Sequence, residues 1–275
     1  MELSKFRLVA ALVTYDGTDY FGFQYQANKK SIQGELEIAL SKFCVYSGRV
    51  VGAGRTDSGV RARGQVIAVK VDWKHDLQAF LRAWNVNLPP SIAICAVCDA
   101  GESFHPRFSA LSRTYSYYVT NNLDLSLRDL QRSPLTDRTS LYVNSPLDVE
   151  AMNQAAHGLI GIHDFAAFGQ PTQGETTYRE MSEAEWRVQE PTFPDSKGAR
   201  TQRLVFTITA NGFLRHMVRN IVGTLLLVGS HRIEANAVQK ILFSKERSAS
   251  GAPVPSCGLI LEKDQYPPEY GVDFL

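Results

Sequence analysis

The sequence is best interpreted outward from one stretch, Val50-Val51-Gly52-Ala53-Gly54-Arg55-Thr56-Asp57-Ser58-Gly59-Val60-Arg61-Ala62-Arg63-Gly64-Gln65-Val66. This stretch places four glycines and three arginines around a single acid, Asp57. Glycines permit positive φ and the close approach of another chain or a ligand. Apolar strand-like runs lie on both sides, so the stretch is typical of an exposed loop between two β-strands. That loop would present one carboxylate in a cationic setting.

The glycine spacing does not fit a loop that cradles nucleotide phosphates. A dinucleotide fingerprint needs G-x-G-x-x-G where a strand gives way to a helix. Here Gly52 and Gly54 are followed by Gly59, a P-loop lysine is missing, and the chain enters a strand expected at 65–71. We therefore expect no nucleotide cofactor at this loop.

Asp57 is a candidate catalytic carboxylate, because an aspartate can be a nucleophile that splits one hard displacement into two. The alternative is structural: Asp57 would cap a turn through an Asx hydrogen bond. A second cationic segment lies far along the chain, where Arg215 and Arg219 stand four residues apart. We expect both arginines on one face of a helix at 213–228. They would form an anion-binding surface, or a partner for Asp57.

The composition indicates a folded protein that is not generally basic. Of 275 residues, 44% are apolar and 21% charged, and the formal net charge is +1. This charge argues against a basic nucleic-acid coat protein, but it leaves room for a local basic patch. The 29 basic residues comprise 19 Arg and 10 Lys. Arginine suits planar, bidentate contacts with phosphate and carboxylate.

The cysteines and the termini predict a soluble cytoplasmic protein without a metal site. Cys95 and Cys98 form a C-x-x-C inside an apolar strand-like run, and no second Cys or His pair follows at zinc spacing. This favours core thiols over a redox or metal site. Four cysteines are too few for a disulfide framework. Residues 1–7 lack the shape of a signal peptide, and the apolar run 221–228 is too short to span a membrane.

The pattern of apolar residues predicts an α+β fold. In the first half, we expect strands at 6–15, just before Val51, at 65–71 and at 92–97, with helices from Ser31 to about Gly48 and from Asp76 to Trp84. The resulting order, β-α-β-β-α-β, is the split βαβ order of a ferredoxin-like domain. The second half has similar elements, including a strand at 112–120 in which Tyr115 and Tyr117 share one face. We expect two ferredoxin-like domains, 5–105 and 106–262, joined into a continuous mixed sheet with a central cleft, and a tail at 263–275.

Several motifs together resemble one family, the TruA-type tRNA pseudouridine synthases. The resemblance covers nearly the whole chain and includes the central loop. Its motifs are Tyr15-Asp16-Gly17-Thr18, Phe21-Gly22-Phe23-Gln24, Ser31-Ile32-Gln33-Gly34-Glu35-Leu36-Glu37, Gly54-Arg55-Thr56-Asp57-Ser58-Gly59-Val60, Asn87-Leu88-Pro89, residues 104–110, Arg113-Thr114-Tyr115-Ser116-Tyr117, the segment 213–223, and Ala252-Pro253 with Gly258-Leu259.

The resemblance implies an enzyme that isomerises uridine to pseudouridine at positions 38, 39 and 40 of the tRNA anticodon stem-loop. No cofactor or metal would be needed, and two chains would form a homodimer around tRNA. Asp57 would be the nucleophile or essential base, Tyr115 would stack on the target base, and Arg219 would pair with Asp57. Arg55 would hold the flipped nucleotide. Further substrate contacts are expected from Arg61, Arg63 and Arg215.

One position departs from the family pattern, and two other functions remain as alternatives. The family usually has His where this chain has Arg61, which adds a permanent charge. One alternative is a tRNA-binding protein that promotes folding of the RNA without essential catalysis. The other is a glycoside hydrolase, which normally needs two carboxylates at the scissile bond, whereas this loop offers one.

Overall fold

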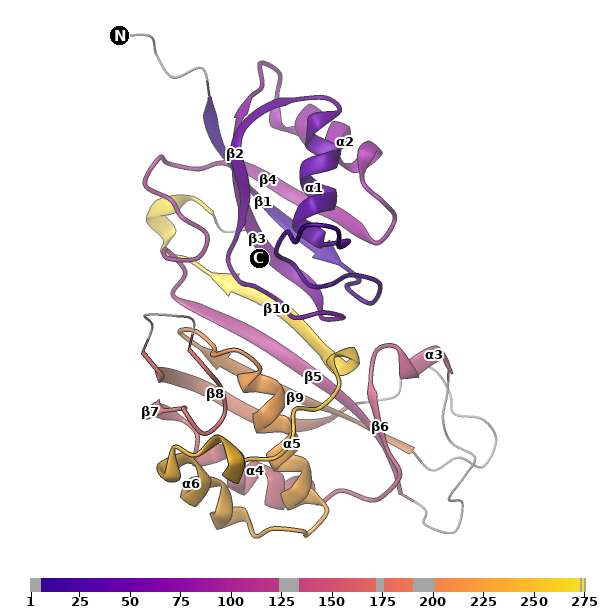
Figure 1. The fold of residues 1–275 in the computed structure, drawn as a ribbon, viewed down its shortest axis with the longest axis vertical. Helices are drawn as coiled ribbons and strands as arrows, with labels where there is room; N and C mark the ends of the chain where they lie inside the picture. Colours follow the sequence, from indigo (N-terminus) through magenta and orange to yellow (C-terminus); the bar gives the residue numbers. More distant parts are fainter. Residues whose placement is uncertain (1–5, 124–133, 172–175, 190–200, 273, 275) are drawn as a thin grey trace. The chain divides into compact units, whose positions relative to one another are not determined.

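The computed structural model describes residues 6–123, 134–171, 176–189, 201–272 and 274, and the chain divides into two compact units (Figure 1). Unit 1 comprises Met1–Arg113 together with Ile260–Leu275. Unit 2 comprises Thr114–Leu259. The last segment of the chain therefore belongs to the same unit as the first.

Unit 1 is a mixed sheet with two helices. Strands β4, β1, β3 and β2 pair antiparallel in that order, and β10 pairs in parallel with the start of β3. The predicted β-α-β-β-α-β order is confirmed for this half, although the first helix ends at Ser41 and not near Gly48 as the sequence predicts. Its elements are β1 (Arg7–Tyr15), α1 (Ile32–Ser41), β2 (Val45–Gly52), β3 (Arg61–Asp72), α2 (Leu77–Asn87), β4 (Ile92–Asp99), β10 (Leu259–Gln265) and the short η3 (Pro268–Tyr270).

The two helices of unit 1 begin where side chains cap them. Ser31 accepts a hydrogen bond from the Gly34 N–H at 3.2 Å, as the sequence predicts for the start of α1. Asp76 accepts one from the Ala79 N–H at 2.7 Å at the start of α2. Each such cap stabilises its helix by about 1 kcal/mol. Trp84 of α2 is fully buried and donates its indole N–H to the carbonyl of Leu36 in α1.

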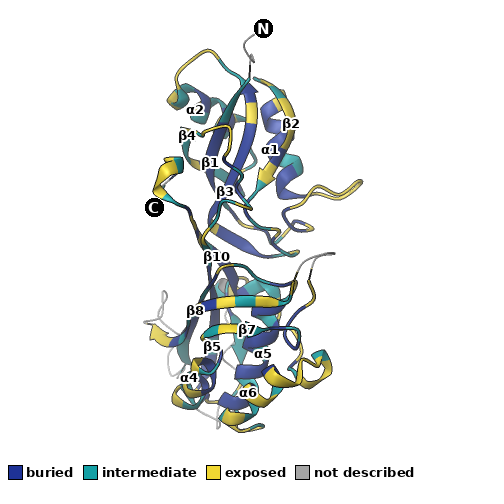
Figure 2. Cartoon of the chain, turned by 90° about the vertical axis from the view of Figure 1, so that its left-hand side faces the viewer, coloured by how far each residue is buried: buried dark blue, intermediate teal, exposed yellow. Residues whose placement is uncertain are grey.

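Both faces of the unit 1 sheet are covered, and its central strands are buried along most of their length (Figure 2). The helices α1 and α2 lie on one face (Figure 1). Ala10 and Leu12 of β1 belong to a core cluster on the other face, together with Phe104, Tyr266 and Val272. Alternate residues of a strand point to opposite faces, so β1 supplies both cores.

Unit 2 is a second α+β unit, in which four strands pair in the order β5-β9-β8-β7 and β6 adds in parallel to β5. A strand, a helix, paired strands and a further helix again follow the split βαβ order, so the predicted α+β class is confirmed. Its elements are β5 (Ser112–Asn122), α3 (Pro134–Asp137), β6 (Leu141–Val143), α4 (Val149–His157), β7 (Gly161–Asp164), β8 (Tyr178–Gln189), β9 (Thr201–Ala210), α5 (Met217–Gly229), α6 (Ala235–Ser244), η1 (Arg247–Ala249) and η2 (Ser256–Gly258).

The helix predicted at 213–228 begins later than expected. Helix α5 starts at Met217, after His216 adopts a left-handed conformation with φ of 62°. Just before it, the Arg215 N–H donates to the carbonyl of Gln170 at 3.1 Å in an antiparallel bridge. This bridge holds Arg215 outside the helix. The prediction that Arg215 and Arg219 share a helical face is therefore wrong.

The C-x-x-C of β4 does not consist of core thiols. Cys95 is exposed, Cys98 is half-buried, and both are free. The error arises because apolar residues on one side of β4, such as Ile92 and Ile94, made the whole run look buried. In the part of the chain that the structure describes, no helix is long and apolar enough to cross a membrane.

Candidate active site

The loop that carries Asp57 joins β2 to β3, as the sequence predicts. Hydrogen bonds join the two ends of this loop. The Ala53 N–H donates to the carbonyl of Val66 at 2.8 Å. The side-chain amide of Gln65, which is completely buried, donates to the carbonyl of Gly54 at 2.7 Å. Backbone and side-chain bonds thus fix both ends of the loop where they leave the sheet.

The segment 15–23 braces the middle of this loop. Thr56 is buried, and its hydroxyl lies 2.8 Å from the hydroxyl of Tyr15. The carbonyl of Thr56 accepts the Phe23 N–H at 3.1 Å. At Gly22, φ is +92° and an added Cβ would lie 2.7 Å from that same carbonyl, so glycine is required there. The N-terminal motif therefore acts as a support for the loop.

Asp57 lies at the start of a tight turn next to the buried Thr56. Its carbonyl accepts the Val60 N–H at 3.2 Å, and Gly59 has φ of 78°, which is the geometry that a type II turn requires at its third residue. The side chain of Asp57 is half-buried. These bonds fix the backbone on both sides of Asp57.

The three arginines of the central stretch have different surroundings. Arg61 is buried: its Nε lies 3.0 Å from Asp16 Oδ1 and its Nη2 donates to Thr18 Oγ1 at 2.6 Å. Arg63 is exposed and bonds both carboxylate oxygens of Glu262 at 2.9 Å. Arg55 is exposed beside Asp57 in the loop itself. Arg61 therefore ties the end of the loop to the N-terminal motif.

Unit 2 brings Tyr115 and Arg219 to one side of its sheet. Tyr115 is nearly buried, and its ring meets that of Phe213 edge-on at 5.2 Å. Two residues further along β5, the Tyr117 hydroxyl donates to the carbonyl of Pro255 at 2.7 Å, and burial raises the pKa of this phenol. Arg219, in the first turn of α5, donates through Nε to the adjacent carbonyl of Val254 at 2.7 Å. Tyr115 and Tyr117 share a strand face, so both flank this segment.

The predicted site residues thus fall into two groups within separate units. Unit 1 holds Asp57 with Arg55, Arg61 and Arg63, and unit 2 holds Tyr115 with Arg219 and the exposed Arg215. Among the residues that the structure describes, no group of three or more His, Cys, Asp or Glu could hold a metal ion.

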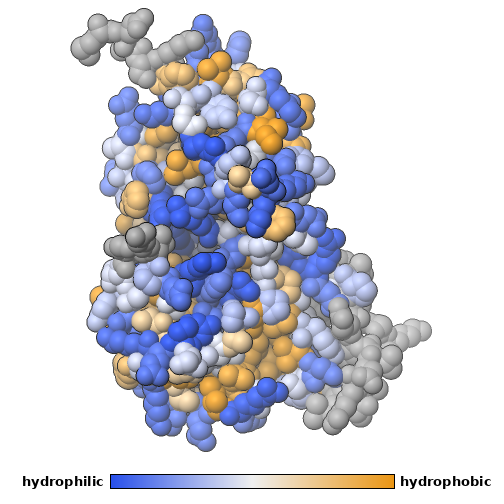
Figure 3. All heavy atoms as spheres, viewed as in Figure 1, coloured by the Kyte–Doolittle hydropathy of each residue, from blue (hydrophilic) through white to orange (hydrophobic). Residues whose placement is uncertain are grey.

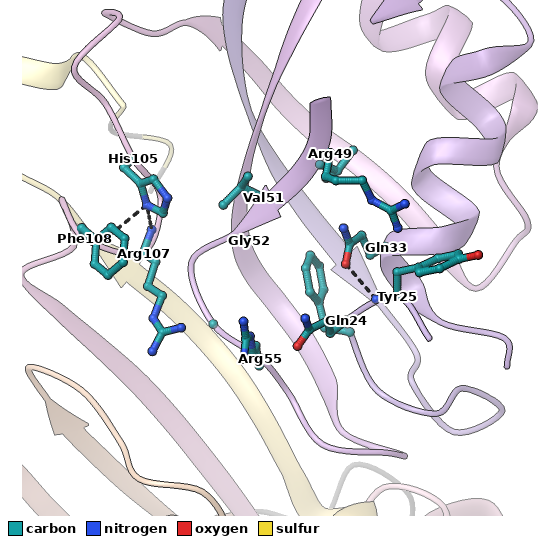
Figure 4. A pocket seen from close by; sticks show the side chains of 13 residues that line it. Gln24, Tyr25, Gln33, Arg49, Val51, Gly52, Arg55, His105, Arg107 and Phe108 are labelled. Carbon is teal, nitrogen blue, oxygen red and sulfur yellow. Dashed lines mark hydrogen bonds between the residues drawn. The ribbon is translucent and has the colours of Figure 1, made fainter. Parts of the chain in front are cut away.

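A pocket of about 490 Å³ in unit 1 was not predicted (Figure 4). Two sequence signals pointed toward it, namely the aromatic and amide residues after Asp19 and the motif at 104–110. Nothing in the sequence around Arg49 indicates that it lines a pocket. Its position there depends on the pairing of β2 with β3, which involves residues distant in the sequence. The pocket is lined by Phe23, Gln24, Tyr25, Gln33, Arg49, Val50, Val51, Gly52, Gly54, Arg55, His105, Arg107 and Phe108.

A buried carboxyl group behind the loop also escaped prediction. Asp264 of β10 accepts the Val66 N–H at 3.0 Å, and its other oxygen lies 3.9 Å from Nε of Arg113. Burial raises the pKa of Asp264 to about 7. Arg113 in turn donates to the carbonyls of Ala53 at 2.9 Å and Arg107 at 2.7 Å. The base of the loop therefore rests on this buried pair.

With this geometry in view, comparison with known proteins identifies the class. The family model described as tRNA pseudouridine synthase matches residues 11–109 and 155–267, which include Asp57 and Arg219. The chain belongs to this family of isomerases. The matched residues do not include Tyr115.

Individual relatives are similar over almost their full length. The chain is 40% identical to tRNA pseudouridine synthase A of Roseiflexus castenholzii over 262 residues, covering 95% of this chain and 91% of the relative. It is 40% identical to the protein of the same name from Chloroflexus aurantiacus over 266 residues, covering 95% and 90%. The corresponding protein of Halalkalibacterium halodurans is 38% identical over 253 residues, covering 90% and 88%. Each of these relatives is named tRNA pseudouridine synthase A.

Proposed function

We propose that this chain converts uridine to pseudouridine at positions 38, 39 and 40 of the tRNA anticodon stem-loop, with Asp57 as its essential carboxylate. The observation that carries the proposal is the loop itself. Asp57 is half-buried between Thr56, whose side chain and carbonyl are both bonded, and a closed turn. A fixed backbone limits the positions that the Asp57 carboxylate can take, which favours nucleophilic or base catalysis. Family membership supports the reaction class.

The reaction is an isomerisation in which no atom or electron is gained or lost. The C1′–N1 bond of uridine breaks, the uracil turns, and a C1′–C5 bond forms. The proton on C5 leaves to solvent, and N1 takes up a proton. Asp57 would start this sequence by attacking C1′, by attacking C6 of the base, or by removing a ribose proton, and it would be released unchanged.

The remaining roles follow from where each side chain lies within its unit. Tyr115 packs edge-on against Phe213. It would offer its ring to the target base and would pass the C5 proton to solvent. Arg219 would pair with Asp57. The exposed arginines Arg55, Arg63 and Arg215 would contact RNA phosphates. Arg61 would act through Asp16, by holding the loop.

Extracting a base from an RNA stem costs a few kcal/mol, which stacking and arginine contacts must offset. In keeping with the family it resembles, the enzyme would work as a cytoplasmic homodimer without a cofactor.

The test is tritium release from tRNA labelled at C5 of uridine. Native protein should release tritium, whereas Asp57→Asn, which preserves the size of the side chain, should release none. The matched control is Asp76→Asn, since asparagine can still cap α2 and this carboxylate lies outside the loop. Equal release by the native and Asp57→Asn proteins, or release by neither, would sink the proposal.

Two further measurements separate the alternative functions. A tRNA-binding protein without essential catalysis would keep its biological effect after Asp57→Ala. A glycoside hydrolase would release free sugar or base in place of an isomer, which mass spectrometry of the digested RNA detects as a loss of mass. The proposed isomerisation leaves the mass unchanged.

A further inference from the structure

The pocket of unit 1 has two walls and a floor that come from different parts of the chain (Figure 4). One wall is the turn at 105–108, and the opposite wall carries Tyr25, Gln33 and Arg49. The floor is the segment from Val51 to Gly54, which leads into the loop of Asp57. Asp57 itself does not line the pocket, so the proposed chemistry leaves this space unused.

The first wall presents an aromatic ring to solvent. Phe108 is 75% exposed, although its ring lies 4.4 Å from the ring of His105 at an angle of 32°. His105 Nδ1 accepts the backbone N–H groups of Arg107 and Phe108, at 3.1 and 3.3 Å. The Ser109 N–H donates to the carbonyl of His105 at 2.9 Å. The guanidinium of Arg107 lies 5.7 Å from the centre of the Phe108 ring, so this exposed ring is flanked by His105 and Arg107.

This wall is also joined to the floor. Arg113 donates to the carbonyl of Arg107 in the turn and to that of Ala53 in the floor. The hydroxyl of Tyr266 donates to the carbonyl of Pro106 at 2.8 Å. A ligand held by the turn would consequently contact a rigid extension of the loop that carries Asp57.

The opposite wall is rigid and also pairs an aromatic ring with an arginine. The guanidinium of Arg49 stacks 4.2 Å from the centre of the Tyr25 ring and lies 3.1 Å from Glu37 Oε2. Gln33 accepts the Tyr25 N–H at 2.7 Å and donates to Glu37 at 3.0 Å. Because Glu37 already neutralises Arg49, the net positive charge of the pocket comes from Arg55 and Arg107.

The lining therefore combines aromatic rings with cationic groups, and no carboxylate is among the described residues that line the pocket. Figure 4 shows the Arg107 side chain extending toward the side of the pocket where Arg55 lies. In the view of Figure 3, apolar atoms of unit 1 are scattered among hydrophilic ones and form no continuous apolar area. Aromatic rings beside arginines suit the stacked bases and phosphates of single-stranded RNA.

We infer that this pocket binds a second, unpaired nucleotide of the substrate RNA, with its base on Phe108 and its phosphate at Arg107 and Arg55. The inference rests on the proposed function, since it assigns the pocket to the same RNA. A volume of about 490 Å³ lies within the range of sites that enclose small ligands, about 300–1,000 Å³. Bound there, the nucleotide fixes the register of the RNA relative to Asp57.

The test uses RNA hairpins with the anticodon stem-loop sequence, in which the loop nucleotides are replaced one at a time by abasic ones. Fluorescence anisotropy gives the affinity of the native protein and of Phe108→Ala for each hairpin. We expect one abasic position, other than the target uridine, to weaken native binding about tenfold, which is the effect of losing one base–aromatic stack. Phe108→Ala should weaken binding of the intact hairpin equally and be insensitive to that abasic position.

Arg107→Gln tests the phosphate contact independently. It should lower the salt dependence of binding by about 0.7 in the slope of log K against log salt, whereas Phe108→Ala should leave that slope unchanged. The matched controls are Phe243→Ala on α6 and Arg82→Gln on α2, both exposed and outside the pocket. Neither control should change the affinity.

The outcomes distinguish this inference from the proposed function. If the native protein forms no pseudouridine, the proposed function fails. If it forms pseudouridine while Phe108→Ala and Arg107→Gln bind every hairpin as native protein does, the pocket does not hold RNA. If Phe108→Ala weakens binding but every abasic position keeps its native effect, no base lies on Phe108, and the inference is overturned.

Discussion

Replacing the buried Asp264 by asparagine should change how the stability of unit 1 depends on pH. Asp264 keeps its proton in the folded protein up to about pH 7, because burial raises its pKa. Asparagine resembles the protonated acid in shape, and its amide oxygen can still accept the Val66 N–H. The Asp264→Asn protein should therefore lack the part of the pH dependence that this carboxyl group causes.

The size of the effect follows from the difference in pKa between the two states. Asp264 has a pKa of about 7 in the fold, against about 3.9 for aspartate in an unfolded chain. Between these values the folded state holds a proton that the unfolded state has lost, so stability falls as pH rises. A difference of about three units corresponds to a loss of up to about 4 kcal/mol between about pH 4 and pH 7.

Urea unfolding followed by tryptophan fluorescence measures this loss. A Trp186→Phe background leaves Trp73 and Trp84 as reporters, and both belong to unit 1. We compare the unfolding free energy of the Asp264→Asn protein with that of the protein that keeps Asp264. Between about pH 4 and pH 8, the Asp264→Asn protein should gain up to about 4 kcal/mol of stability relative to the other. Asp99→Asn, at an exposed ion pair with Arg7, is the control and should shift by less than about 1 kcal/mol.

A difference that stays constant from about pH 4 to pH 8 would refute this reasoning. It would mean that Asp264 is ionised in the folded protein and that the nearby guanidinium of Arg113 outweighs the cost of burial. A shift in the opposite direction at pH values below about 4 would show that the fold stabilises the carboxylate, as in an ordinary surface ion pair.

Three further substitutions test the site. Tyr115→Phe should keep RNA affinity but reduce single-turnover tritium release by about 100-fold or more, as for loss of a proton-transfer group, and unchanged turnover would refute that role. Arg61→His should keep turnover but lower the unfolding free energy by about 1–2 kcal/mol, because its bonds to Asp16 weaken; a large loss of tRNA affinity would show instead that its charge reaches the RNA. Gly22→Ala should cost about 2 kcal/mol or more in urea unfolding, because of its positive φ and the nearby Thr56 carbonyl, and native stability would refute the close approach.

Patterns among residues close in sequence predicted most of the helices and strands correctly. The cap at Ser31, the helix after Asp76 and the loop between two strands each depend on residues close in sequence, and all three are confirmed. The late start of α5 was not predictable in this way. It depends on a bridge between Arg215 and Gln170, which are far apart in the chain.

The candidate site was predictable in its residue types but not in their surroundings. Nothing near Arg61 in the sequence indicates that it is buried against Asp16; the register of β1 on β3, which pairs Tyr15 with Ala62, brings the two together. In the same way, the pocket depends on tertiary pairing that places Arg49 opposite the turn of Phe108. Sequence patterns reveal which groups are present, whereas long-range register decides which of them meet.

The position of the last strand bears on the order in which the protein folds during synthesis. Residues 260–275 complete unit 1: β10 pairs with β3, and Tyr266 and Val272 share a core cluster with Ala53 at the base of the catalytic loop. All of unit 2 is synthesised before these residues leave the ribosome. Unit 2 can therefore fold while unit 1 still lacks part of its core. The loop of Asp57 would then gain its full support only in the last moments of synthesis, so an incomplete chain would present no finished site to RNA.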